Sequence, residues 1–192
     1  MLNDVNYKIL SVTSESNVDD LAKRDMLARV KKDGYALRWA SAELQGDQEI
    51  VLAAVSQNGV VLVHASAELK GDREIVLAAV SQNGYTLRYA SAELRGDRAI
   101  VLAAVRQDGW ALQYASAELK GDREIVLAAV NQDGRALRYA PDEMTGDQEI
   151  VLAAVSNNAD VLQYASDALK NGGLKSYVER LINQYNVTKD TF

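Results

Sequence analysis

The chain has 192 residues, no cysteine, one histidine and a formal net charge of −6. The absence of cysteine excludes a disulfide framework, a zinc–thiolate site and a cysteine nucleophile. A single histidine, His64, excludes any site that needs two, and the acidic balance disfavours a nucleic-acid-binding protein. With 48% apolar and 25% charged residues, the composition is that of a globular chain.

Residues 1–21 are expected to form an N-terminal segment that mixes polar side chains with a few apolar ones. It lacks the apolar run of a signal peptide, and the longest apolar stretch, residues 99–105, is far shorter than the roughly 20 residues that span a bilayer. We therefore expect a cytoplasmic protein with no membrane partner. The next segment, residues 22–33, predicts a helix with charges at Asp25 and Arg29, where later copies have Ile and Ala.

A repeat of 25 residues runs from about residue 22 to residue 170. Each copy contains a Gly-Asp pair, an apolar run and then Asn-Gly or Asp-Gly, which is degraded to Asn158-Ala159 in the last copy. A period of this length is the signature of a stacked array. The run Ile-Val-Leu-Ala-Ala-Val is identical in five copies, which start at Ile50, Ile75, Ile100, Ile125 and Ile150.

The first half of each unit predicts an α-helix, represented by residues 72–83. Asp72 is a candidate N-cap, and Glu74 places negative charge in the first turn. Gly84 is predicted to be the left-handed residue that ends the helix. Asn-Gly between apolar runs is also a hairpin signal, but the Ala-Ala pair and the lack of alternation argue against strands.

The second half of the unit places Leu87, Ala90 and Leu94 on one helical face. Pro141 occupies the position of Ser91, and proline inside a helix costs about 3 kcal/mol. We therefore predict a short helix over residues 84–90, followed by a separate turn over residues 91–95. The serines predicted to cap this turn are Ser41, Ser66, Ser91, Ser116 and Ser166.

The first helix of the unit is apolar nearly all round, so it must be buried on several sides by neighbouring units. The predicted fold class is therefore all-α: an α-solenoid of about six 25-residue helix-pair repeats. Residues 22–170 form the array, and residues 171–192 are predicted to form a C-terminal capping helix and tail within the same structural domain. The outward-facing side of that last helix carries Lys175, Glu179 and Arg180.

The repeated pattern EIVLAAV, then QNG or QDG, then AL-x-YAS-x-EL resembles a tandem repeat family catalogued only as a domain of unknown function. The resemblance covers about residues 34–170 and departs from the pattern at His64, Pro141 and Ala159. Such repeats occur in effector-like proteins of intracellular bacteria and in protist and algal proteins. The resemblance implies an all-helical interaction module and allows translocation into a host cell, and it implies no catalytic residues.

Two carboxylate rows recur with the period. Calcium binding between stacked loops is one interpretation, but capping of the first helix explains every aspartate, and the glutamates fit a solvated turn. No catalytic, metal or cofactor site is predicted. The rows are Asp47, Asp72, Asp97, Asp122 and Asp147, and Glu43, Glu68, Glu93, Glu118 and Glu143.

An aromatic row is predicted to form a half-buried ladder whose polar atoms contact solvent, and in this row His64 stands where the other units have an aromatic residue, mostly tyrosine. Two further positions, three residues apart, vary freely among fixed neighbours and are predicted to be exposed on one face. Their residue types are those of protein interfaces, which favours a binding role. The alternative is that these positions vary by neutral sequence drift on an exposed surface without a function. The aromatic row is Trp39, His64, Tyr89, Tyr114, Tyr139 and Tyr164. The candidate partner-binding residues are Tyr35, Tyr85, Trp110, Arg135, Arg38, Arg88, Gln113 and Arg138.

These observations favour a non-enzymatic repeat scaffold that binds an unknown protein partner through the variable positions. The alternatives are a structural spacer or a solenoid that associates end to end. A third interpretation is single-stranded RNA binding, suggested by the row Arg73, Arg98 and Arg123 interleaved with tyrosines. Residues 72–121 are neutral and residues 122–171 carry a charge of −5, which argues against RNA.

Overall fold

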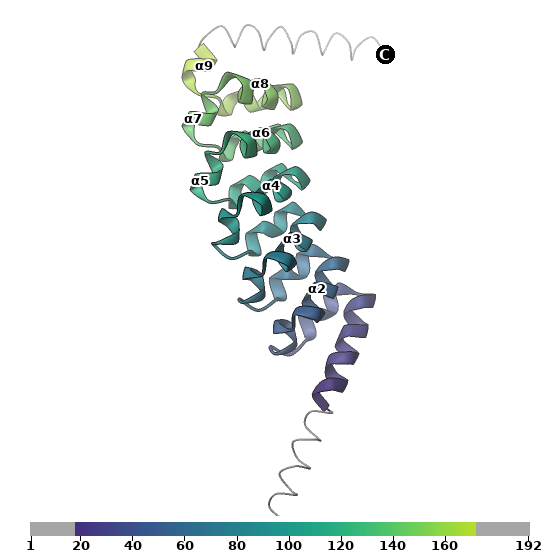
Figure 1. Ribbon diagram of the computed structural model, residues 1–192. Coiled ribbons are helices and arrows are strands. Elements are labelled where there is room, and N and C mark those ends of the chain that lie inside the picture. Colours follow the sequence, from purple (N-terminus) through teal and green to yellow (C-terminus); the bar gives the residue numbers. More distant parts are fainter. Residues whose placement is uncertain (1–17, 172–192) are drawn as a thin grey trace, which may run out of the picture.

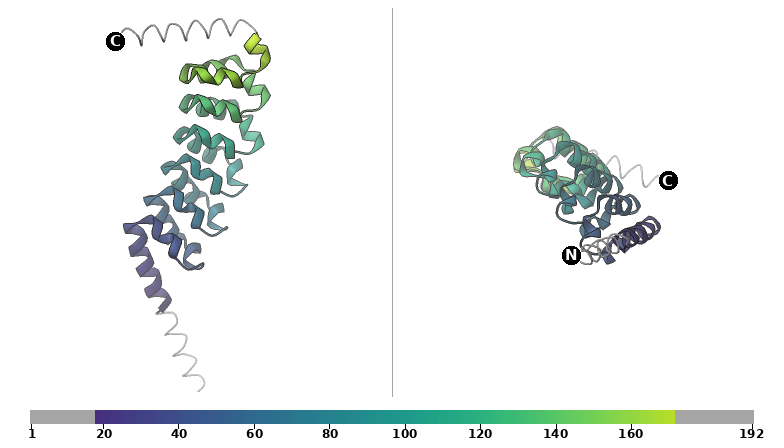
Figure 2. Two further views of the ribbon diagram at one scale, coloured as in Figure 1. Left: turned by 180° about the vertical axis from the view of Figure 1, so that it is seen from behind. Right: turned by 60° about the horizontal axis from the view of Figure 1, so that its bottom comes forward.

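The computed structural model describes residues 18–171, and they form a single column of stacked helical units (Figure 1). The column runs from a helix over residues 18–32, purple in Figure 1, to the short helix α9 (Asp167–Asn171), which is yellow. The view from behind shows the same order with each unit stacked on the one before it (Figure 2). The predicted all-α repeat solenoid is confirmed. The predicted capping helix over residues 171–192 lies almost entirely outside the described residues.

Each unit after the first contains an α-helix of ten residues, and its bounds agree with the sequence prediction to within one residue. The Asp side chain before each helix accepts a hydrogen bond from the backbone N–H of the Ile three residues on, as between Asp72 and Ile75 at 3.0 Å. The predicted N-caps are therefore present in all five copies. The helices are α2 (Gln48–Gln57), α3 (Arg73–Gln82), α4 (Arg98–Gln107), α6 (Arg123–Gln132) and α8 (Gln148–Asn157).

The second half of each unit is a six-residue 3-10 helix, represented by η5 (Gly84–Tyr89). The prediction placed a short helix here but not its type. The Asn or Asp that ends the α-helix also caps the 3-10 helix, because Asn83 Oδ1 accepts from the backbone N–H of Tyr85 at 3.0 Å. The equivalent helices are η1 (Gly34–Trp39), η3 (Gly59–His64), η7 (Gly109–Tyr114), η8 (Gly134–Tyr139) and η9 (Ala159–Tyr164).

The predicted left-handed role of Gly84 is wrong, since no described glycine has a positive φ. The glycine is needed for space instead. A Cβ built on Gly84 would lie 2.2 Å from the carbonyl oxygen of Ala104 in the next unit. The same contact recurs with the glycines that begin η1, η3, η7 and η8. Close approach of consecutive units therefore selects glycine at this position.

A short turn completes each unit and carries backbone hydrogen bonds between units. Ser91 N–H donates to the carbonyl oxygen of Lys70 at 2.8 Å, and the same bond recurs at Ser66, Ser116 and Ser166. Pro141 has no N–H and cannot make it. The turns contain η2 (Leu44–Gly46), η4 (Leu69–Gly71), η6 (Leu94–Gly96), α5 (Ala117–Lys120), α7 (Asp142–Thr145) and α9.

Four of the five serines predicted to cap this turn do so. Ser91 Oγ accepts from the backbone N–H of Leu94 at 3.3 Å, and Ser41, Ser66 and Ser116 make the same bond. The prediction for Ser166 is wrong: its Oγ is buried and has no hydrogen-bond partner among the described residues, and the N–H of Leu169 donates to the Ser166 carbonyl oxygen instead.

The core is a continuous apolar column along the axis of the array. Each ten-residue α-helix contributes four buried residues, such as Ile75, Val76, Ala79 and Val80 at 0% exposure. The first five 3-10 helices each contribute a buried leucine, such as Leu87, whereas the equivalent Leu162 of η9 is half-buried. Consecutive α-helices contact one another, and so do consecutive 3-10 helices. Stacking therefore places the α-helices on one side of the column and the 3-10 helices on another. Within residues 18–171, no helix is long and apolar enough to cross a membrane.

Candidate functional site

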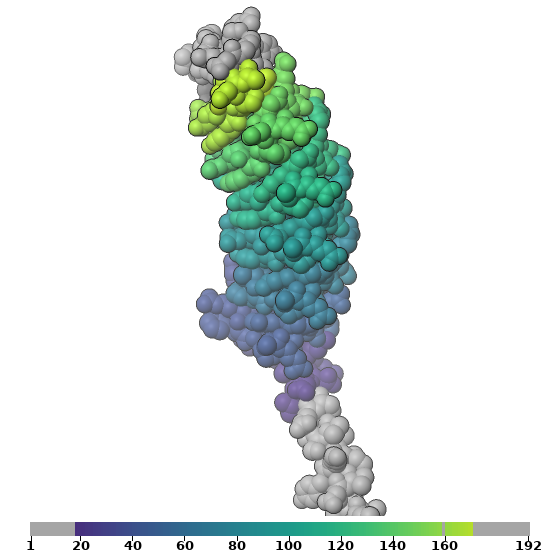
Figure 3. All heavy atoms as spheres, turned by 90° about the vertical axis from the view of Figure 1, so that its left-hand side faces the viewer, coloured from purple at the N-terminus to yellow at the C-terminus, as the bar shows by residue number. Residues whose placement is uncertain are grey.

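The 3-10 helices bring the aromatic row and both variable rows together. In a 3-10 helix, side chains three residues apart eclipse each other, so Tyr85 and Arg88 stack in one column and Tyr89 lies beside them. Repetition through six units makes a continuous surface along the solenoid, whose elongated outline Figure 3 shows. We call it the aromatic–arginine face. Its members are Tyr35, Val60, Tyr85, Trp110, Arg135 and Asp160; Arg38, Val63, Arg88, Gln113, Arg138 and Gln163; and Trp39, His64, Tyr89, Tyr114, Tyr139 and Tyr164.

The first unit presents the most exposed aromatic side chains of this face. Trp39 is 71% exposed and Tyr35 is 50% exposed. The guanidinium carbon of Arg38 lies 4.9 Å from the centre of the Trp39 ring, which is cation–π geometry. The next unit has the smaller side chains Val60 and Val63, both half-buried, in the equivalent positions. The first unit therefore forms a separate exposed cluster at the N-terminal end of the face.

The third and fourth units share a cluster built around Arg88. Its guanidinium carbon lies 5.1 Å from the ring centres of both Tyr85 and Tyr89 and 5.9 Å from that of Tyr114. Its Nη1 also donates to the Tyr85 hydroxyl at 2.8 Å. Tyr85 and Tyr114 meet edge to face at 5.2 Å. Burial first, and the neighbouring Tyr85 hydroxyl second, raise the pKa of Tyr114 to about 12.

The fourth and fifth units share a second cluster around Trp110. Trp110 Nε1 donates to Asp133 Oδ2 at 2.8 Å, and the ring meets Tyr139 at 5.7 Å between centres. The guanidinium carbons of Arg135 and Arg138 lie 5.2 Å and 5.9 Å from its centre. The sequence-predicted residues Trp110 and Arg135 are therefore brought together, and each side chain uses part of its surface in contact with the other.

Asp133 holds this second cluster in place, a role that its position in the sequence does not indicate. Arg135 Nη2 is 2.6 Å from Asp133 Oδ2, and the Trp110 indole donates to the same oxygen. The Arg135 guanidinium is the main cause that lowers the pKa of Asp133 to about 2; the backbone N–H of Arg135 and the Trp110 indole act in the same direction. Asp133 occupies the same position of the repeat as the capping residue Asn83. The recurrence of Asn or Asp at this position indicates a cap and gives no sign of the second role of Asp133.

The other predicted residues differ in exposure. Tyr85, Arg88, Arg135 and Arg138 are exposed, whereas Gln113 is half-buried and its Nε2 donates to the Trp110 carbonyl oxygen at 3.1 Å. His64, the replaced tyrosine, is half-buried. Burial, followed by the nearby positive charges of Arg38 and Lys70, lowers its pKa.

The row Arg73, Arg98 and Arg123 lies away from this face and pairs with carboxylates of the following unit. Arg98 Nε is 2.9 Å from Asp122 Oδ2, and its Nη2 contacts Glu124. Arg123 makes the same pair with Asp147 and Glu149, and Arg73 contacts Asp97 at 3.1 Å. These arginines therefore join neighbouring units, and the aspartates both cap helices and accept these ion pairs.

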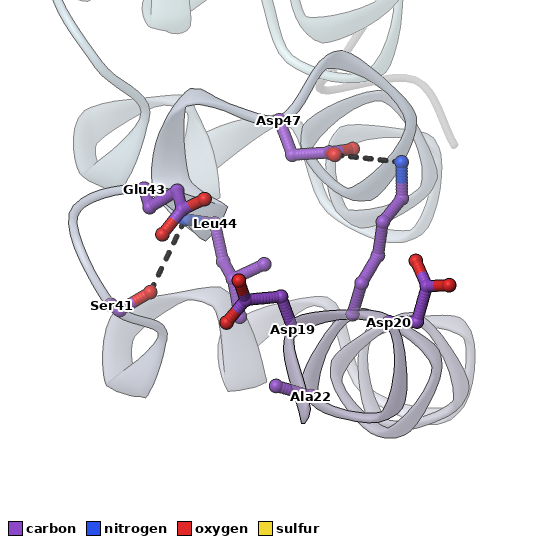
Figure 4. Close-up of a pocket in the computed structure, with 8 residues that line it drawn as sticks. Asp19, Asp20, Ala22, Ser41, Glu43, Leu44 and Asp47 are labelled. Atoms are coloured by element: carbon purple, nitrogen blue, oxygen red, sulfur yellow. Dashed lines mark hydrogen bonds and ion pairs between the residues drawn. The ribbon is translucent and has the colours of Figure 1, made fainter. Parts of the chain in front are cut away.

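A hollow of about 270 Å³ lies beside the helix over residues 18–32 (Figure 4). Asp19, Asp20, Lys23 and Glu43 line it, and Lys23 Nζ lies 2.7 Å from Asp47 Oδ2. Among residues 18–171, no three His, Cys, Asp or Glu side chains are placed to hold one metal ion. Lys23 occupies the position of Arg73, so this hollow contains the first link of the inter-unit ion pairs.

The fold and the surface define a helical repeat protein. The family model described as domain of unknown function DUF4116 matches residues 25–70, 72–120 and 122–170, so the chain belongs to this family in three tandem copies. Each copy spans two of the 25-residue units. No curated protein and no solved structure matches the chain.

Proposed function

We propose that this protein is a non-enzymatic scaffold that binds a protein partner through the aromatic–arginine face. The observation that supports this most directly is the composition of the face, because tyrosine, tryptophan and arginine are the residues that dominate binding energy at protein interfaces. The face carries them in adjacent units and on short helices that are anchored in the core by buried leucines.

The contacts within the face support a role in binding. Arg88 and Arg138 each stack on tyrosines, and the Trp110 ring is fixed by Asp133 and Tyr139. Side chains that are already ordered lose little entropy when a partner binds, so they contribute more of their contact energy to affinity. The scaffold acts by presenting this surface, and no bond is made or broken.

Affinity capture with three matched baits tests the proposal. The face variant carries Tyr35→Ser, Trp39→Ser and Tyr85→Ser, which removes the three exposed aromatic rings of the face. The control variant carries Val18→Ser and Leu21→Ser, two apolar side chains that are each 63% exposed on the first helix. Circular dichroism and thermal unfolding of each bait establish that it is folded.

We expect a protein captured by the intact chain and by the control variant, but not by the face variant. Equal capture by all three baits would contradict the proposal and favour a spacer. Capture of further copies of the chain, lost in the Val18→Ser, Leu21→Ser variant, would favour end-to-end self-association instead.

A further inference from the structure

We propose that the partner presents an extended acidic peptide, whose carboxylates bind Arg38, Arg88 and Arg138 in turn. This inference rests on the proposed function and names the chemistry of the partner. The three arginines occupy the same position in alternate units, with Val63 and Gln113 between them.

These three guanidinium groups are not neutralised by a carboxylate of the described residues, although Arg88 Nη1 donates to the Tyr85 hydroxyl. In the described part of the chain, Arg38, Arg88 and Arg138 form no ion pair, whereas Arg73, Arg98, Arg123 and Arg135 all do. Each of the three is exposed and stacks on an aromatic ring of its own unit, at 4.9 Å, 5.1 Å and 5.3 Å from guanidinium carbon to ring centre. A guanidinium has five N–H donors, so its contact with a ring leaves further N–H groups available for bidentate binding of a carboxylate.

The charge of the face differs in sign from that of the whole chain. The chain has a net charge of −6, but the face holds four arginines and only one carboxylate, Asp160. Asp133 neutralises Arg135, so three unpaired positive charges remain. Because the rest of the chain has a net negative charge, an acidic ligand gains favourable electrostatic contacts on this face. Charge complementarity also orients such a ligand along the row of arginines.

The spacing of the arginines fits an extended chain. Packed helices lie about 8–10 Å apart, so arginines two units apart are separated by roughly 16–20 Å. An extended peptide advances about 3.3 Å per residue, which places one carboxylate at every fifth or sixth residue. Consecutive 3-10 helices contact each other along the whole row, so the peptide meets a continuous surface.

The same contacts favour a peptide over single-stranded RNA. Sequence-tolerant RNA binding needs aromatic faces on which bases stack and cations that follow every phosphate. Here Arg135 and Arg138 cover the Trp110 ring, and Arg88 lies against Tyr85, Tyr89 and Tyr114. One free arginine in every second unit is too sparse for a phosphate at each nucleotide.

Selection from a random peptide library displayed on phage tests the inference with the full chain as bait. The arginine variant carries Arg38→Gln, Arg88→Gln and Arg138→Gln. The charge-matched control carries Lys31→Gln, Arg106→Gln and Lys120→Gln, which removes three positive charges outside the face. Enriched peptides are then synthesised, and their affinities for the three proteins are measured by fluorescence anisotropy at low and high salt.

We expect enriched peptides to carry Asp or Glu at intervals of five or six residues. Their affinity should fall roughly tenfold or more in the arginine variant and by less than about threefold in the control. Enrichment of neutral or basic peptides that need Tyr35, Trp39 and Tyr85 would overturn the acidic partner while preserving the scaffold function. Failure to enrich any peptide would overturn this inference, whereas the capture experiment tests the scaffold separately. Binding of poly(U) that depends on the same three arginines would overturn it in favour of RNA.

Discussion

The Cα of Gly84 lies so close to the next unit that an added Cβ would be 2.2 Å from the carbonyl oxygen of Ala104. The obstacle is backbone in the middle of helix α4, which cannot move without shifting the unit. Glycine is therefore required at this position because only a residue without a side chain lets consecutive units approach this closely.

Gly84→Ala should destabilise the protein by at least about 2 kcal/mol, because the methyl group forces two units apart. Gly71→Ala is the matched control, since its Cβ would lie 3.7 Å from Ser91 Oγ, an ordinary contact. We expect its effect to stay within about 0.5 kcal/mol. Denaturant unfolding of both variants measures this difference, and equal midpoints would contradict the spacing role.

The inter-unit ion pairs predict a stabilising substitution. Gln48 occupies the position of Arg73 and Arg98, and the carboxylates of the next unit, Asp72 and Glu74, form no ion pair within the described residues. Gln48→Arg should complete the series and stabilise the protein by about 0.2–1 kcal/mol at low salt. Gln48→Glu adds a like charge at the same site and should destabilise it. Thermal unfolding at low and high salt checks both; a gain that persists in high salt would argue against an ion pair.

Pro141 predicts a second stabilising substitution. Its φ of −70° and ψ of 165° resemble those of Ser116, −58° and 158°, so proline fits the backbone. Its only cost is the loss of the two hydrogen bonds that Ser116 makes, one from its N–H and one to its Oγ. Pro141→Ser restores the N–H that can donate to the Lys120 carbonyl oxygen and an Oγ that can cap the turn. After the entropy advantage of proline is subtracted, we expect a gain of about 1 kcal/mol.

Pro141→Ala separates the two contributions, because alanine restores the N–H without the hydroxyl. The stability order in denaturant unfolding should therefore be serine, then alanine, then proline. A variant with serine less stable than the native chain would show that the inter-unit bond is not regained.

The sequence predicted the regular parts of the unit and missed those that depend on how units meet. Asp72 was identified as a cap because capping is local. The sequence predicts a left-handed conformation for Gly84 because a helix end and a close backbone contact both select glycine, and only the packing of units distinguishes the two. The link from Arg98 to Asp122 spans neighbouring units; its signal was the recurrence of Arg at one position and Asp 24 residues later.

Two candidate site residues show the same limit. Variation at Trp110 and Arg135 predicts exposed positions, but Trp110 is half-buried, and the two side chains lie one unit apart and bind the same carboxylate. Aligning the repeats compares each position only with its equivalents in other units, so it does not detect contacts between different positions. The contact between Trp110 and Arg135 occurs once, between the fourth and fifth units, and therefore leaves no periodic pattern in the sequence.

The cluster at Asp133 predicts an acid-dependent contribution to stability. Its pKa is lowered to about 2 in the folded protein, mainly by Arg135, against an ordinary value of 3.8. A group with a lowered folded pKa stabilises the protein above its unfolded pKa and loses that contribution as the pH falls through the folded value. The contribution should therefore be complete above about pH 5 and largely lost by about pH 2. Its size is at most about 2 kcal/mol, and less in salt, because Arg135 is 55% exposed.

Asp133→Asn tests this by denaturant unfolding at neutral and acidic pH. The variant should be less stable than the native chain at pH 7, and the difference should shrink as the pH falls toward 2, where both proteins have a neutral side chain at this position. The caps Asp97, Asp122 and Asp147 also have lowered pKa values, so both proteins weaken in acid and only their difference reports on Asp133. Asp160→Asn, at an exposed aspartate of the same face, should leave stability unchanged at both pH values. A difference between the native chain and Asp133→Asn that is independent of pH would show that the carboxylate charge contributes nothing.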